Sequence, residues 1–146
     1  MADLEGSYSA FLPVSPKAAT EAILDVGSYP KWWSRSVKTS LAKGAGGKAS
    51  VGSLIEVKLE KVSFEYEVKK IEPGKKIELA CVGGSYRGPA SWTFAPEKKG
   101  TRVTYHVSLD AAGMMVKMMG KAVDVGAIHE KILTGSLERL AENLAK

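Results

Sequence analysis

The sequence predicts an α+β protein: a curved antiparallel sheet of about six to seven strands wrapped around a long C-terminal helix, with two short helices after the first strand. Two patterns indicate this fold. Hydrophobic and polar residues alternate through residues 51–110, which is typical of strands with one buried face. In residues 121–145 the hydrophobic residues instead recur about every 3.6 residues, which predicts one long helix. Such a helix buries its apolar stripe against the concave side of the sheet.

The N-terminal part predicts one strand and two short helices. Residues 6–13 read as the first strand. Ser15 suits a helix N-cap and Pro16 the first helical position, so a helix is expected over 16–26. A second short helix is expected over 28–34, and it contains the stretch YPKWW. Adjacent helical residues point about 100° apart, so Trp32 and Trp33 are expected to differ in environment, with Trp32 as the buried one.

Alternation then predicts five strands separated by short turns, over 51–60, 62–70, 75–82, 86–94 and 101–110. Pro73-Gly74 and the stretch PEKKG mark two of the turns. The inward faces of these strands are unusually aromatic. They carry Phe64, Tyr66, Tyr86, Trp92, Phe94 and Tyr105.

The buried stripe of the long helix changes character along its length. Its C-terminal half carries Leu133, Leu137, Leu140 and Leu144. Its N-terminal half carries Ala122, Gly126 and His129. Small residues facing a curved sheet leave space unfilled, so a pocket is expected under residues 122–129.

His129 admits three interpretations. It is a core histidine that bonds the hydroxyl of Tyr66 or Tyr105, a group that contacts a ligand without chemistry, or a general acid–base catalyst. A buried imidazole needs a hydrogen-bond partner in each case. Met114, Met115, Met118 and Met119 precede it and are interpreted as an adaptable cover over the pocket or as a short core helix.

Composition narrows the class of protein. A chain of 146 residues fits one domain, 1–146. The single cysteine, Cys81, excludes an internal disulfide, and His106 and His129 lie on opposite sides by pattern, so no metal site is expected. The net charge of +5 comes from scattered lysines, so no nucleic-acid partner is expected. The sequence shows no secretory signal or membrane span, and a cytoplasmic location is expected.

Four stretches together resemble the START-like, helix-grip superfamily, also described as the polyketide cyclase/dehydrase and lipid-transport family. They are SPKAATEAILDVGSYPKWW, YRGPASWTFAP, GTRVTYHVSL and HEKILTGSLERLAENL, in that order along the chain. The resemblance covers nearly the whole chain. It implies a helix-grip fold with an internal hydrophobic cavity, and it leaves the activity open, because the family includes carriers, receptors, cyclases and chaperone co-factors.

The predicted function is binding or transport of a hydrophobic small molecule, such as a lipid, a quinone or an aromatic polyketide, without a cofactor. The residues predicted to contact it are Trp32, Trp33, Phe64, Tyr66, Tyr86, Trp92, Tyr105, Met118, Ala122, Gly126 and His129. One alternative is a cyclase or dehydratase that uses His129 with Tyr66 or Tyr105. Another is a protein-binding module of the co-chaperone kind. A transient membrane contact and a monomeric or homodimeric state are also expected.

Overall fold

A computed structural model of the protein describes residues 4–33, 38–43, 48–58, 63–84, 86–111 and 125–145. The side chains of residues 125–130 lie outside the described part. Seven antiparallel strands form one sheet in the order β1-β7-β6-β5-β4-β3-β2. The strands are β1 (Leu4–Leu12), β2 (Lys38–Lys43), β3 (Leu54–Lys58), β4 (Ser63–Glu72), β5 (Lys76–Gly84), β6 (Tyr86–Glu97) and β7 (Gly100–Ala111). The predicted curved antiparallel sheet is confirmed.

The two short helices after β1 are α1 (Pro16–Leu24) and the 3₁₀ helix η1 (Val26–Lys31). Ser15 caps α1 as expected, because its Oγ accepts a hydrogen bond from the backbone N–H of Ala18. The predicted boundary at residue 26 was two residues late. Asp25 is the C-cap of α1, and the 3₁₀ helix η1 begins at the next residue, Val26, where a separate helix was expected from residue 28.

Strand β2 was not predicted as a separate element. It pairs with β3 at one edge of the sheet, from Lys38 opposite Lys58 to Lys43 opposite Leu54. Its sequence, KTSLAK, holds one large aliphatic residue, so alternation does not mark it. Only its neighbour β3 identifies it as a strand, which brings the sheet to seven strands.

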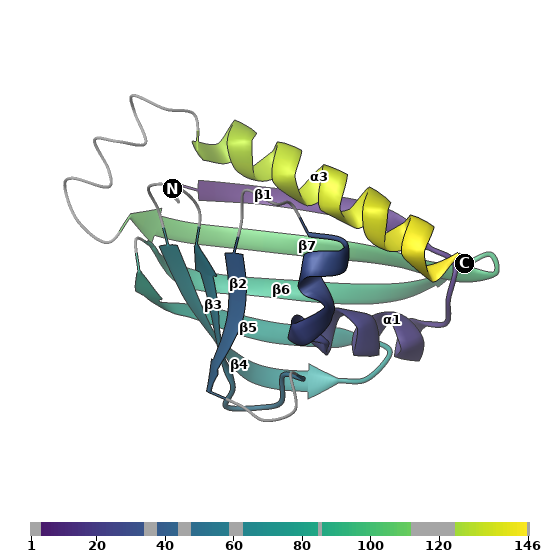
Figure 1. Ribbon diagram of the computed structural model, residues 1–146, viewed down its shortest axis with the longest axis horizontal. Helices are drawn as coiled ribbons and strands as arrows, with labels where there is room; N and C mark the ends of the chain where they lie inside the picture. The colour runs from purple at the N-terminus through teal and green to yellow at the C-terminus, as the bar shows by residue number, and fades with distance from the viewer. Residues whose placement is uncertain are drawn as a thin grey trace.

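The long helix α3 (Val125–Leu144) runs alongside the edge strand β1 and packs on it (Figure 1). Leu133, Leu137 and Leu140 are buried, as the leucine stripe predicts. At its C-terminal half α3 also holds η1. The Arg139 Nε donates to the carbonyl oxygen of Trp32 at 2.8 Å, and the Asn143 side chain donates to that of Lys31 at 3.2 Å. The helix therefore positions the YPKWW stretch against the sheet.

The opposite face of the sheet is solvated and bears ion pairs between residues two apart on one strand. Examples are Lys58 with Glu56 at 2.9 Å, Lys69 with Glu67 at 3.3 Å and Lys76 with Glu78 at 3.1 Å. Lysines on this face alternate with carboxylates, so they form no continuous basic stripe on these strands. Within the described ranges, no helix is both long enough and apolar enough to cross a membrane.

Candidate ligand-binding site

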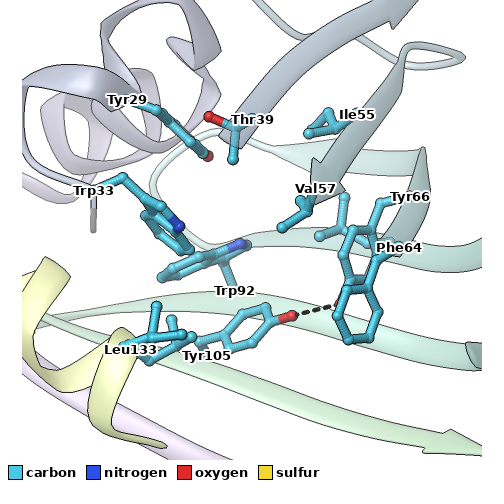
Figure 2. Close-up of a pocket in the computed structure, with 12 residues that line it drawn as sticks. Tyr29, Trp33, Thr39, Ile55, Val57, Phe64, Tyr66, Trp92, Tyr105 and Leu133 are labelled. Carbon is cyan, nitrogen blue, oxygen red and sulfur yellow. Dashed lines mark hydrogen bonds between the residues drawn. The ribbon is translucent and has the colours of Figure 1, made fainter. Parts of the chain in front are cut away.

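A cavity lies between the concave face of the sheet, η1 and α3. The space open to the centre of a water molecule is about 60 Å³, within a hollow of about 600 Å³ that includes open solvent. The first volume holds several waters. The lining residues come from three kinds of element. They are Tyr29 and Trp33 at η1, Ile132 and Leu133 of α3, and Thr39, Ile55, Val57, Phe64, Tyr66, Leu79, Trp92 and Tyr105 of the sheet (Figure 2).

Two tyrosines meet inside this cavity. The hydroxyls of Tyr66 on β4 and Tyr105 on β7 form a hydrogen bond of 3.1 Å (Figure 2). Strands β5 and β6 separate β4 from β7, so in a flat sheet the two backbones lie about 14 Å apart. The hydroxyls meet because the sheet curls and both side chains point into the concave side.

Burial sets the protonation state of this pair. It raises the pKa of Tyr66 well above its ordinary value, and the neighbouring Tyr105 adds to the rise. Burial likewise raises the pKa of Tyr105, although the hydrogen bond from Tyr66 opposes the shift. Both hydroxyls are therefore neutral near pH 7, and they offer a ligand hydrogen bonds but no charge.

Aromatic rings form much of the remaining wall. Trp92 lies against Tyr105 with ring centroids 4.6 Å apart. Phe64 stacks on Tyr66 at 6.0 Å and on Tyr86 at 5.2 Å. Rings held against one another in this way are stiff, so the wall presents flat, apolar surfaces.

The YPKWW stretch forms the wall opposite the sheet. The Tyr29 hydroxyl donates a hydrogen bond to the carbonyl oxygen of Ile23 in α1, and burial raises its pKa. Trp32 is 3% exposed and lies in the core, whereas Trp33 is partly buried and lines the cavity. The prediction that the two tryptophans differ, with Trp32 buried, is confirmed.

The structure brings five of the predicted contact residues into the cavity wall: Trp33, Phe64, Tyr66, Trp92 and Tyr105. Trp32 and Tyr86 are not in the wall. The ring of Trp32 turns into the core, edge-on to Trp33 at 5.1 Å. Tyr86 is buried, stacks on Phe64 and is not among the lining residues.

Four other predicted contacts are not placed by the structure. Met118 and Ala122 lie outside the described residues, as does the whole stretch Met114–Met119. Gly126 and His129 belong to α3, but their side chains lie outside the described part. The three interpretations of His129 therefore stay as they were.

Sequence reasoning missed several wall residues. Thr39 lies on the unpredicted strand β2, and Ile132 lies beside the leucine stripe of α3. Ile55, Val57 and Leu79 lie within the strands predicted over 51–60 and 75–82 but were not predicted to contact a ligand. Tyr29 offered a signal, because it precedes Trp33 by four residues, which is one helical turn. The two rings stack at 5.3 Å.

Two residues with reactive or charged side chains, Cys81 and Arg87, are not among the lining residues of the cavity. The Cys81 thiol is buried near the carbonyl oxygen of Tyr86 at 3.2 Å, and burial raises its pKa, which makes it a poor nucleophile. Arg87 is exposed and donates to the carbonyl oxygens of Gly84 and Tyr86. Among the described residues, no group of three or more His, Cys, Asp or Glu side chains is placed to hold a metal ion.

Comparison with known proteins gives a family and a fold. A family model described as "Polyketide cyclase / dehydrase and lipid transport" matches residues 4–146. A search of curated proteins found no matching relative. The family match and the fold support binding of hydrophobic ligands in general.

Several solved structures share the fold at low sequence identity. KanY is 19% identical, with each chain fully covered and a TM-score of 0.76. Ginseng major latex-like protein 151 from Panax ginseng is 12% identical, covers 98% of this chain and 99% of its own, and has a TM-score of 0.70. The Aha1 dimer from Colwellia psychrerythraea is 19% identical, with 97% and 96% covered and a TM-score of 0.61.

Proposed function

The chain belongs to the polyketide cyclase / dehydrase and lipid transport family, and on that premise we propose that it binds a lipophilic small molecule in the cavity under η1 and acts as a carrier or sensor. The observation that carries this proposal is the composition of the wall. Aromatic and aliphatic side chains dominate it, and its polar atoms are a few hydroxyls and indole nitrogens. Ligand pockets typically combine an apolar lining with a small number of orienting polar groups.

The state of the polar groups supports binding over catalysis. The Tyr66 and Tyr105 hydroxyls are bonded to each other, and their raised pKa values make them poor bases near pH 7. A cyclase or dehydratase would need a group that takes up a proton. His129 was the candidate, and no observation on the described residues favours that reaction.

The first experiment asks whether the cavity takes up a hydrophobic molecule. Native mass spectrometry of freshly purified protein should show a co-purified small molecule, or titration with Nile red, an uncharged fluorescent dye, should show saturable binding. Val57→Phe places a larger ring in the cavity wall and should weaken Nile red binding by at least tenfold. Val82→Phe makes the same change on β5 at a side chain that is 39% exposed and should leave binding unchanged.

The matched pair separates cavity binding from surface adsorption. If both variants bind Nile red like the wild type, the dye binds elsewhere and the cavity is not the site. If the wild type carries no co-purified molecule and takes up no dye, the proposed function is wrong.

A further inference from the structure

One polar atom in the cavity wall lacks a partner. The indole nitrogen Nε1 of Trp33 is buried and has no hydrogen-bond partner, and it is the only buried side-chain nitrogen or oxygen in this position among the described residues. Among the described residues no protein atom replaces the water that this N–H loses on burial, and such an unreplaced bond costs free energy. Native proteins rarely leave such a group unsatisfied, so this one calls for an explanation.

The direction of this N–H matters. Trp33 is a lining residue, and Figure 2 shows its nitrogen turned toward Trp92 and the inside of the cavity. An indole N–H donates a hydrogen bond and cannot accept one. The missing partner is therefore an acceptor that enters the cavity.

The indole is also held in place. The Trp33 backbone N–H donates to the carbonyl oxygen of Tyr29 at 2.6 Å, and the Tyr29 ring stacks on the indole at an interplanar angle of 15°. Trp32 packs against it edge-on, and Arg139 fixes the carbonyl oxygen of Trp32 from α3. A donor fixed in this way loses little conformational entropy when a ligand binds.

The lack of charged side chains among the described wall residues favours an uncharged acceptor. Among the lining residues that the structure describes, there is no Lys, Arg, His, Asp or Glu. A carboxylate or phosphate buried against these described residues would find no counter-charge among them and would lose its hydration. A carbonyl oxygen avoids both costs, since it is neutral and needs only a donor.

We propose that Trp33 determines specificity in this pocket. Its indole N–H donates a hydrogen bond to an uncharged carbonyl oxygen of a lipophilic ligand about the size of a small aromatic ring system. This inference rests on the proposed function and adds the chemical class of the ligand. Ketones and quinones meet the description, whereas hydrocarbons lack the acceptor and carboxylates carry the wrong charge at this wall.

The test compares three probes of similar shape: 2-acetylnaphthalene, 2-ethylnaphthalene and 2-naphthoate. The first carries a ketone, the second replaces that carbonyl with a methylene group, and the third carries a carboxylate. Dissociation constants come from isothermal titration calorimetry. In the wild type the ketone should bind about tenfold more tightly than the hydrocarbon. The carboxylate should bind more weakly than the ketone.

Two variants locate the donor. Trp33→Phe keeps an aromatic ring but removes the N–H, so the ketone-to-hydrocarbon preference should fall to about one. The ratio cancels the loss of packing that both probes share. Thr39→Val removes a lining hydroxyl at nearly constant volume and should keep the preference. Circular dichroism checks that both variants fold.

A second measurement needs no variant. In a ¹H–¹⁵N spectrum of the wild type, the indole resonance of Trp33 should move downfield with 2-acetylnaphthalene and much less with 2-ethylnaphthalene. An unchanged ketone preference in Trp33→Phe, an equal loss in Thr39→Val, or tighter binding of 2-naphthoate would each overturn the inference. Failure of all three probes while Nile red binds would also overturn the inference, whereas the absence of both a co-purified molecule and Nile red binding would overturn the proposed function.

Discussion

The two ends of the concave groove differ in how completely they are filled. At the end under α1, side chains are closely covered, and Leu12, Ala19, Val68, Ile77 and Val103 are at most 1% exposed. At the end under η1 the same strands border the cavity with Tyr66, Trp92 and Tyr105. Figure 1 shows α1 and η1 following one another along the same side of the sheet.

The difference follows from side-chain shape. Branched aliphatic groups interdigitate and reach the packing density of a protein interior. Flat aromatic rings that stack on one another, such as Phe64 on Tyr66, cannot also bend into the space in front of them. The comparison shows that one sheet holds both a core and a binding site, because the residue types change along β4 to β7.

Hydrogen bonds also connect the α1 end of the groove to the sheet. The Thr20 Oγ1 accepts a hydrogen bond from the backbone N–H of Gly74 in the β4–β5 turn, at 3.0 Å. The Thr101 hydroxyl donates to the carbonyl oxygen of Val14 at 2.8 Å. Gly74 has φ of +77°, which a glycine adopts without strain. These contacts join α1 and the segment before it to the sheet, and we expect this end to carry the greater share of stability.

The largest effect is expected from emptying the packed end. Leu12→Ala removes a side chain that is 0% exposed and whose strand partner, Thr101, lies outside the cavity wall, and it should lower the free energy of unfolding by about 2–5 kcal/mol. Urea denaturation measures the loss, and Nile red affinity of the folded protein should stay the same. A loss of dye binding without a loss of stability would mean that the two ends are not separate.

An intermediate effect is expected from alkaline pH at the cavity end. Burial raises the pKa of Tyr29, Tyr66 and Tyr105, whereas an unfolded tyrosine ionises near pH 10. Above about pH 10 the unfolded state therefore binds fewer protons than the folded state, so stability present at lower pH is lost as the pH rises. Denaturant midpoints from pH 8 to 11 measure this.

The tyrosine origin of this loss can be isolated. Tyr66→Phe should make the alkaline loss shallower than in the wild type, because one buried hydroxyl no longer titrates on unfolding. Parallel curves for the two proteins would mean that other groups cause the loss.

The smallest effect is expected outside the groove altogether. Glu97 and Arg102 form a bidentate ion pair at 2.9 and 3.0 Å, and this pair lowers the pKa of the Glu97 carboxyl. Both side chains are more than a third exposed, so water and salt screen the attraction. Glu97→Gln should leave the thermal midpoint and Nile red affinity unchanged at neutral pH. A clear drop in either would show that the outer face contributes to what the groove does.

The sequence alone determined the fold and the inward residue types. Alternation along β4 to β7 identified the faces that carry Phe64, Tyr66, Trp92 and Tyr105, since successive strand residues point to opposite sides. The leucine spacing of α3 identified its buried stripe. Periodicity failed at β2, where polar residues dominate, and with it the wall position of Thr39 was missed.

Only the tertiary structure decided how these residues meet. The curl of the sheet joins the hydroxyls of Tyr66 and Tyr105 across two intervening strands, and no local pattern encodes that distance. The 3₁₀ helix η1 places Trp32 in the core and Trp33 at the cavity. The Trp33 indole N–H has no hydrogen-bond partner among the described residues. Periodicity reports which side of an element a residue faces, whereas partners depend on how separate elements pack.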